Sequence, residues 1–294
     1  MAKIAVAVER ALARRKALGT AGETTPRIIA AGDGWTVADV VCTAGPHDRS
    51  FEERHTKYTI AIVLAGTFQY RSTLGRHLMT PGALMLGNPG QCFECGHEHG
   101  QGDRCVSFWY APDYLERLTA DGRPRRRGMS FNVTRLPPLQ RLAPLVARTA
   151  AGVIDSDGVP WEEIGVSLAV RSMNLAADAS VDRRPLPPNA EARVTRTVRL
   201  IDQRPDAALT LGTLAQEAGL SPYHFLRVFE RLTGLTPHQY VRRARLREAA
   251  VRLEADEGKV LDIALDCGFG DVSNFNRAFR AEFGVNPGIY RASR

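Results

Sequence analysis

The sequence predicts an α+β protein, with a β-rich N-terminal part and an all-α C-terminal part. Two observations carry this prediction. Residues 27–112 consist of short runs of strand-forming residues separated by Gly and Pro, which is typical of antiparallel strands joined by turns. Residues 193–294 instead show helical periodicity, and one motif occurs in them twice. Such self-similarity indicates a duplicated structural module.

The first copy of the motif reads LAQEAGLSPYHFLRVF at 214–229, and the second reads IALDCGFGDVSNFNRAF at 263–279. Gly219 matches Gly268, and after one inserted residue further positions match at an offset of 50. These further positions are Phe225, Arg227, Phe229, Gly234, Pro237 and Tyr240, which match Phe275, Arg277, Phe279, Gly284, Pro287 and Tyr290. Each copy predicts a helix that stops at Gly and a second helix that starts two to three residues later. This pattern is a helix-turn-helix.

The outward faces of the two second helices carry side chains that suit DNA. Arg227 and Arg277 stand at matching positions, and Arg bonds guanine in a bidentate manner. Asn274 suits adenine, while Tyr223 and Ser273 reach bases or phosphates. The alternative is that these are solvated polar residues on surface helices. The occurrence of two copies, each with an Arg at the matching position, favours a DNA reader.

Residues 193–294 resemble the DNA-binding domain of the AraC (arabinose regulator) family, through both motif copies and through GLTPHQYVRRARL at 234–246 and GVNPGIYR at 284–291. The resemblance implies two helix-turn-helix units bridged by one long helix over 237–253, which place two recognition helices in successive major-groove turns of double-stranded DNA. It implies base contacts by Tyr223, Leu226, Arg227, Val272, Ser273, Asn274 and Arg277. Leu226 and Val272 are apolar, so we expect contact with thymine methyl groups there, or none.

Composition is consistent with this assignment. A chain of 294 residues allows about two domains, and a formal charge of +7 suits an anionic partner. There is no apolar run of 18 residues, so no membrane span is expected. Residues 1–26 are a poor signal peptide and better fit a short helix or an arm. Five cysteines without a secretion signal indicate the reducing cytoplasm.

Within 27–112 we expect strands at 35–42, 58–64, 67–71, 83–86 and 104–110, which suggest a jelly roll or small barrel enclosing a pocket. Gly75 followed by Pro81 and Gly82 resembles part of a cupin motif. AraC-family regulators often carry such a cupin-like sensing domain. The resemblance therefore implies a sensor barrel at 27–112, open to a small-molecule effector.

Residues 113–181 change to a helical texture, with two longer helices expected over 139–151 and 161–177. By resemblance to the family they form a homodimer interface, and ordinary core packing explains their apolar stripes equally well. Residues 182–192 are rich in Pro and charge, which is typical of an interdomain linker.

A cysteine and histidine cluster at 92–105 is the sharpest feature outside the DNA reader. Cys92 and Cys95 are spaced to hold one ion across a tight turn, and thiolate and imidazole ligands favour zinc. His97, His99 and Cys105 complete the candidate site. Two alternatives stay open. A Cys pair near His or Arg104 would have a lowered thiol pKa and sense redox changes, or the cysteines are core residues and the histidines polar loop residues.

We therefore expect a cytoplasmic transcription regulator without catalytic residues, controlled by a ligand, metal or redox signal at its N-terminal domain. The alternative class is an enzyme fused to a DNA-binding domain: a cupin metalloenzyme, or a repair protein that accepts an alkyl group on Cys92, Cys95 or Cys105. That class predicts turnover of an organic substrate or alkyl transfer to one of these cysteines, and absence of stoichiometric metal would exclude both the enzyme and a metal sensor.

Overall fold

The computed structural model describes residues 2–48, 52–97, 100–120, 130–154, 158–179, 189–255 and 258–292. The chain divides into two compact units. The N-terminal unit comprises residues 2–139 and 152–184, and the C-terminal unit comprises residues 140–151 and 185–294. The helices between the strands and the duplicated motif are thus shared between the two units.

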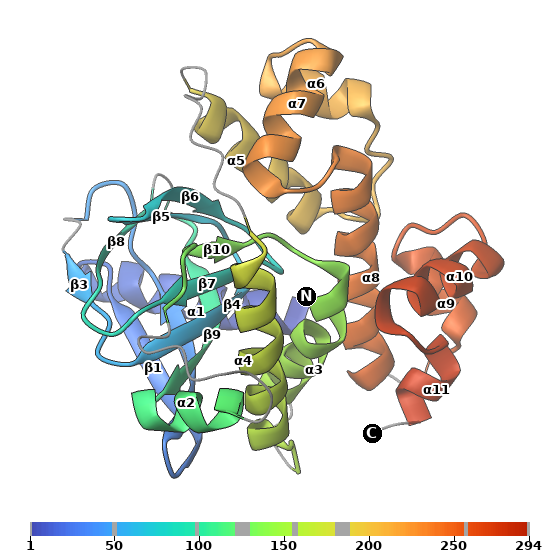
Figure 1. Cartoon of the computed structure of the whole chain (residues 1–294). Coiled ribbons are helices and arrows are strands. Elements are labelled where there is room, and N and C mark those ends of the chain that lie inside the picture. Colours follow the sequence, from blue (N-terminus) through green and yellow to red (C-terminus); the bar gives the residue numbers. More distant parts are fainter. Residues whose placement is uncertain are drawn as a thin grey trace. The chain divides into compact units, whose positions relative to one another are not determined.

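The N-terminal unit is built on two antiparallel sheets (Figure 1). The larger sheet has the order β1-β2-β9-β4-β7-β10 and the smaller one β3-β8-β5-β6. The strands are β1 (Thr24–Gly32), β2 (Trp35–Cys42), β3 (Glu53–Arg54), β4 (Tyr58–Ala65), β5 (Phe68–Ser72), β6 (Gly75–Met79), β7 (Leu84–Gly87), β8 (Cys92–Gly96), β9 (Asp103–Tyr110) and β10 (Arg135–Leu136). Strands distant in sequence are therefore neighbours, as in a jelly roll.

The five expected strands are confirmed as β2, β4, β5, β7 and β9, with ends that agree to within one residue. The sequence pattern missed the other strands. In β1 most side chains are exposed and Pro26 interrupts the run, so neither alternation nor composition indicates a strand. Gly75, expected in a turn, is the first residue of β6.

Apolar side chains from both sheets meet in one core. Its buried members are Ala61, Val63, Phe68, Tyr70, Met79, Ala83, Met85 and Cys105. Alternate residues of each strand contribute, because successive side chains of a strand point to opposite faces. The core therefore lies between the sheets.

Three helices accompany these sheets: α1 (Ala2–Leu18), α2 (Pro112–Ala120) and α4 (Trp161–Ala177). Helix α4 buries Ile164 and Leu168, and the Tyr110 hydroxyl donates a 2.8 Å hydrogen bond to the Gly165 carbonyl. Arg15 of α1 forms an ion pair with Asp48 at 2.7 Å. Among the described helices of the whole chain, none is long and apolar enough to cross a membrane.

The C-terminal unit is helical. It contains the short helix η1 (Gln140–Leu142), the first part of α3 (Ala143–Ile154), α5 (Ala190–Gln203), α6 (Leu211–Ala218), α7 (Pro222–Thr233), α8 (Pro237–Ala255), α9 (Val260–Asp266), α10 (Val272–Phe283) and α11 (Pro287–Ala292). Gly219 and Gly268 adopt φ values of +62° and +85° in the turns α6–α7 and α9–α10, a conformation that favours Gly. Two helix-turn-helix units result, and α8 joins them (Figure 1).

The two helix-turn-helix units share one aromatic packing pattern. In the first copy the ring centroids of Phe225 and Phe229 are 5.3 Å apart, and Tyr240 meets Phe229 edge-on at 5.6 Å. The corresponding distances in the second copy, between Phe275, Phe279 and Tyr290, are 5.4 Å and 5.2 Å. The matching positions of the repeated motif are thus mainly interior positions.

Candidate functional site

The two recognition helices, α7 and α10, begin with side-chain caps. The Ser221 hydroxyl accepts a hydrogen bond from the His224 backbone N–H, and Pro222 occupies the first turn. In α10 the Asp271 carboxylate accepts one from the Asn274 backbone N–H at 2.6 Å. Each cap satisfies a backbone donor that the helix itself leaves unpaired. The first turn of each helix is therefore fixed.

The predicted base-contacting residues all lie on the accessible faces of these helices. The exposed ones are Tyr223, Arg227, Ser273, Asn274 and Arg277, and the half-buried ones are Leu226 and Val272. The opposite faces are buried, with Phe225, Phe229, Phe275 and Phe279 fully inside. The polar side of each helix is thus available to a partner.

Each recognition helix holds its arginine through a side chain about one turn earlier in the helix. Arg227 donates a 3.4 Å hydrogen bond to the Tyr223 hydroxyl, and its guanidinium lies 5.8 Å from the centre of that ring. Arg277 donates a 3.3 Å hydrogen bond to the amide oxygen of Asn274. Both contacts span one helical turn on the exposed face. They align the arginines along the helix while leaving guanidinium donors free, since Arg has five.

An open groove of about 870 Å³ lies between α9, α10 and α11. Arg277 and Arg280 line it, together with Asn276 and Asn286. The repeated motif does not single out Asn276 or Asn286, because the matching positions of the first copy hold no Asn. The groove also has apolar lining, from Val260, Val272 and Pro287.

The structure does not build the expected Cys-x2-Cys turn. Cys92 and Cys95 lie on strand β8, and Phe93 and Cys95 pack against the core between the sheets. Because side chains alternate along a strand, Cys92 faces the opposite side. Cys105 is buried on β9, and His99 lies outside the described residues. Cys92 and Cys95 therefore do not converge on one ion.

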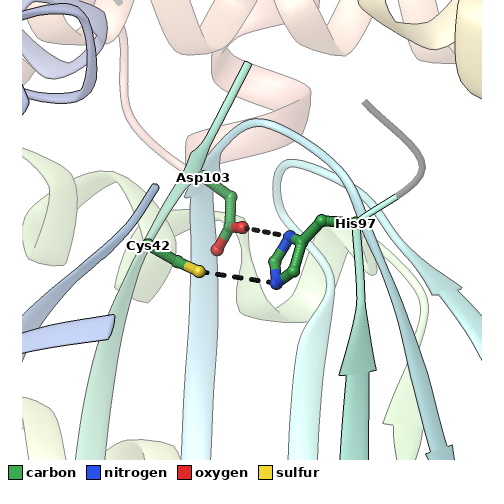
Figure 2. A group of neighbouring side chains, drawn as sticks. All are labelled: Cys42, His97 and Asp103. Atoms are coloured by element: carbon green, nitrogen blue, oxygen red, sulfur yellow. Dashed lines mark hydrogen bonds and ion pairs between the residues drawn. The ribbon is translucent and has the colours of Figure 1, made fainter. Parts of the chain in front are cut away.

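A different cluster forms around His97 (Figure 2). The Cys42 sulfur lies 3.4 Å from His97 Nε2, and His97 Nδ1 lies 3.2 Å from Asp103 Oδ2. Cys42 ends β2 and Asp103 begins β9, where the two residues are paired across the sheet. His97 directly follows β8 of the other sheet. Of the described residues, these three are the ones whose Cys, His and carboxylate atoms lie close enough to hold a metal ion.

The cluster is almost entirely shielded from water. Cys42 is 5% exposed, and the side chains of His97 and Asp103 are each 6% exposed. Burial acts to lower the pKa of His97, but Asp103 and Cys42 outweigh it and raise that pKa to about 10. Burial raises the pKa of Asp103, although His97 opposes the shift. The two groups therefore form a coupled buried pair.

The cysteine pKa shifts run against the redox hypothesis. Burial raises the pKa of the Cys95 and Cys105 thiols well above the ordinary value. Arg104, expected to lower a thiol pKa, instead donates hydrogen bonds of 2.8 and 2.9 Å to the Asp39 carboxylate. Burial acts to raise the pKa of Asp39, but Arg104 and Arg27 bring it below the usual value. Arg104 therefore pairs with Asp39 and not with a cysteine thiol.

Two protein families match parts of this chain. The family described as "AraC-like ligand binding domain" matches residues 38–159, and the family described as "Helix-turn-helix domain" matches residues 214–293. The regulatory protein SoxS of Salmonella typhimurium is 36% identical over 94 residues, which cover 32% of this chain and 88% of SoxS. The chain belongs to the AraC family.

Two further similarities concern transcription factors. The HTH-type transcriptional activator AarP of Providencia stuartii is 38% identical over 85 residues, covering 29% of this chain and 63% of AarP. The crystal structure of the DNA-binding domain of AdpA in complex with a target DNA is 30% identical, covers 34% of this chain and 91% of that chain, and has a TM-score of 0.34.

AraC-family membership confirms the expected fold class and the general function. The chain is an α+β member of a family of DNA-binding transcription regulators, with a ligand-binding domain at its N-terminal side and a helix-turn-helix region at its C-terminal side. The cupin resemblance and metal binding receive only weak support from the comparisons.

Proposed function

We propose that this AraC-family protein regulates transcription by reading a specific DNA sequence with α7 and α10, under the control of a signal received by its N-terminal unit. The observation that carries the proposal is the duplicated surface. In both helices the aromatic side is buried, while Tyr223, Arg227, Asn274 and Arg277 are exposed and held by contacts across one turn.

In this proposal Arg227 and Arg277 each bind a guanine through two donors, and Asn274 binds an adenine. Tyr223 and Ser273 contact bases or phosphates, while Leu226 and Val272 pack on thymine methyl groups. Other Lys and Arg side chains neutralise phosphates, which makes binding fall with rising salt concentration.

The signalling side of the proposal concerns the N-terminal unit. A small-molecule effector that binds one conformation of this unit better than another shifts the equilibrium between them. We propose that the regulator acts as a homodimer in the cytoplasm, that helices within 113–181 contribute to the dimer interface, and that 182–192 link this part to the DNA-binding domain at 193–294. The effector then changes how the paired subunits present α7 and α10.

The enzyme alternative has less support. Alkyl transfer to a cysteine needs a reactive thiolate, and burial raises the pKa of both Cys95 and Cys105. Cys92 lies on the face of β8 away from them. We therefore propose a regulator that binds rather than converts its effector.

The proposal is tested with the full chain and a duplex selected from a randomised pool by the wild-type protein. Arg227→Ala and Arg277→Ala should each weaken binding to that duplex by about 1–3 kcal/mol and relax the preference at one base pair. Arg196→Ala is the charge-matched control, because Arg196 is exposed on α5, outside both recognition helices. Fluorescence anisotropy with single-base-pair variants of the duplex measures both effects.

Two results would contradict this reading. If Arg227→Ala lowers affinity equally for all sequences, Arg227 is a phosphate contact and not a base reader. If the wild-type protein enriches no sequence from the pool, the proposal of sequence-specific regulation fails.

A further inference from the structure

We propose that Cys42, His97 and Asp103 form a binding site for one divalent transition-metal ion, and that Zn²⁺ is the ion it takes. The proposal concerns the N-terminal unit alone and is independent of DNA binding. It changes the ligand set suggested by the sequence, because His97 remains while Cys42 and Asp103 replace Cys92, Cys95 and Cys105.

The first argument is convergence. One ligand atom from each of the three residues lies within 4.8 Å of the other two. Zinc–sulfur and zinc–nitrogen bonds of about 2.3 and 2.0–2.1 Å at a tetrahedral angle place the two ligand atoms about 3.6 Å apart. The Cys42 sulfur and His97 Nε2 are 3.4 Å apart. Their present separation is therefore close to that of a zinc-bound pair.

The second argument comes from unsatisfied polar atoms. His97 Nδ1 and Asp103 Oδ2 are buried and have no hydrogen-bond partner among the described residues, although they face each other as an ion pair at 3.2 Å. Buried polar groups without a partner are costly. An ion bonded to a His97 nitrogen and to an Asp103 oxygen would supply these buried groups with a partner. Metal binding would thus give both groups a defined role.

The third argument is the position of the cluster in the fold. Cys42 and Asp103 sit opposite each other on β2 and β9 of the larger sheet, while His97 follows β8 of the smaller sheet (Figure 2). An ion held by all three therefore cross-links the two sheets. Because it binds only the folded state, it stabilises the N-terminal unit by mass action.

The donor set selects the ion. One thiolate, one imidazole and one carboxylate combine a soft, a borderline and a hard ligand, a combination that zinc accepts and that calcium and magnesium do not. A reactive cysteine can also lie beside a histidine and a carboxylate, but its sulfur must be accessible to the reagent. Cys42 is 5% exposed, which favours a bound ion over a surface nucleophile.

Cobalt substitution provides a direct test. Chelator-treated full-length protein is titrated with Co²⁺, which reports tetrahedral coordination by visible absorption and a thiolate ligand by a near-ultraviolet charge-transfer band. We expect one Co²⁺ per chain, a charge-transfer intensity corresponding to a single thiolate, and displacement by Zn²⁺. Metal analysis after addition of Zn²⁺ should likewise give one ion per chain.

Substitutions identify the ligands. Replacing a residue that only orients a ligand costs about 10–100-fold in affinity, so Cys42→Ser should weaken Co²⁺ binding by at least that factor and abolish the charge-transfer band. Asp103→Asn removes the carboxylate ligand, so it should weaken binding by at least the same factor while the band remains. Cys92→Ser and Cys267→Ser are the matched controls, since Cys92 faces away from the core and Cys267 is buried in the C-terminal unit. Both should bind Co²⁺ as the wild type does.

Unfolding gives a second readout. The three tryptophans of the chain, Trp35, Trp109 and Trp161, all lie in the N-terminal unit, so their fluorescence follows this unit selectively. Zn²⁺ should raise its thermal midpoint in the wild type and in Cys92→Ser, but not in Cys42→Ser.

The proposal is overturned if the wild-type protein takes up neither Co²⁺ nor Zn²⁺, or if the charge-transfer band persists at full intensity in Cys42→Ser. Should Cys42→Ser not fold, a bound Co²⁺ in the wild type without a thiolate band has the same meaning. DNA binding is measured separately, so a negative metal result leaves the proposed regulator function unaffected.

Discussion

His55 is a buried histidine held in place on three sides. One of its ring nitrogens, Nε2, is 2.8 Å from the Tyr70 hydroxyl, and its ring stacks on Phe93 with centroids 4.1 Å apart. A Cβ atom at Gly87 would lie only 2.3 Å from the ring. The ring therefore has no room to reach solvent when it is protonated.

Burial lowers the pKa of His55 from 6.5 to about 4. Between pH 6.5 and 4 the unfolded chain thus binds a proton at this residue that the folded chain does not. The free energy of unfolding of the N-terminal unit must then decrease as the pH falls through this window. We expect His55→Gln to remove this contribution, so that its stability difference from the wild type shrinks by roughly 2–3 kcal/mol between pH 7 and pH 4.

Denaturant unfolding followed by tryptophan fluorescence measures this difference. His47→Gln is the control, because His47 is exposed in the same unit, and it should follow the wild-type pH dependence. Burial also lowers the pKa of His77 to about 4. His77 therefore contributes to the decrease of the free energy of unfolding with falling pH in every variant. Parallel curves for the wild type and His55→Gln would show that His55 is protonated in the folded state.

The metal cluster shows what residue patterns in the sequence do not reveal. The Cys-x2-Cys spacing points to Cys92 and Cys95, because a motif can show only ligands that are close in sequence. Cys42 precedes His97 by 55 residues, and the register that pairs it with Asp103 is set by the packing of whole strands. His97 was found because it lies inside the dense segment, and Cys42 was not.

At the scale of helices, two arginines tie down the turns of the repeated units. Arg193 donates hydrogen bonds of 3.0 and 2.6 Å to the carbonyls of Ala218 and Gly219. Arg245 on α8 donates to the carbonyls of Pro205, Ala207 and Gly268 at 2.7–2.9 Å. In both copies the glycine turn before the recognition helix is therefore bonded to a guanidinium.

We predict that Arg245→Met destabilises the C-terminal unit by about 2–4 kcal/mol, because three carbonyl groups lose a charged donor. Arg242→Met on the exposed side of the same helix is the control and should change stability by less than about 0.5 kcal/mol. Thermal unfolding followed by helical circular dichroism measures both. Equal losses in the two variants would mean that side-chain charge, and not bonding to the turns, is the relevant property.

Elements with a clear period were predictable, and short elements were not. The strand β2 was predicted with its observed ends, and α4 likewise, because buried strands and amphipathic helices show their period in the sequence. The Cys-x2-Cys spacing predicts a metal-binding turn where the structure has strand β8, because the two cysteines are more prominent than the short strand pattern. Strands β3 and β10 have only two residues each, too few for any period to appear.

For the molecule as a DNA reader, the connection between the two helix-turn-helix units matters most. Helix α8 has 19 residues, which corresponds to a rod of about 28 Å. Leu246, Ala249 and Leu253 of α8 pack with Phe275 and Phe279 of α10 in one buried core. The second recognition helix, α10, is therefore packed against α8 and does not move independently of it.

This rigidity predicts a fixed spacing within the recognised sequence. Inserting about 5 or about 10 base pairs between its two halves should weaken binding as much as losing one half, since one turn of B-DNA is about 10–10.5 base pairs and the rod cannot lengthen. Anisotropy with the selected duplex and its two insertion variants measures this. Full affinity for the 10-base-pair insertion would instead indicate that a flexible connection joins the two helix-turn-helix units.

The paired aromatic rings of the two copies have a consequence for how such a protein diversifies. Because Phe225, Phe229 and Tyr240 and their counterparts Phe275, Phe279 and Tyr290 form the interior of the two copies, mutations at the outer positions of one helix leave both scaffolds undisturbed. Each half can acquire a new preferred base sequence while the other keeps the old one. The protein can then acquire affinity for a new promoter by changing its preference for one half-site at a time.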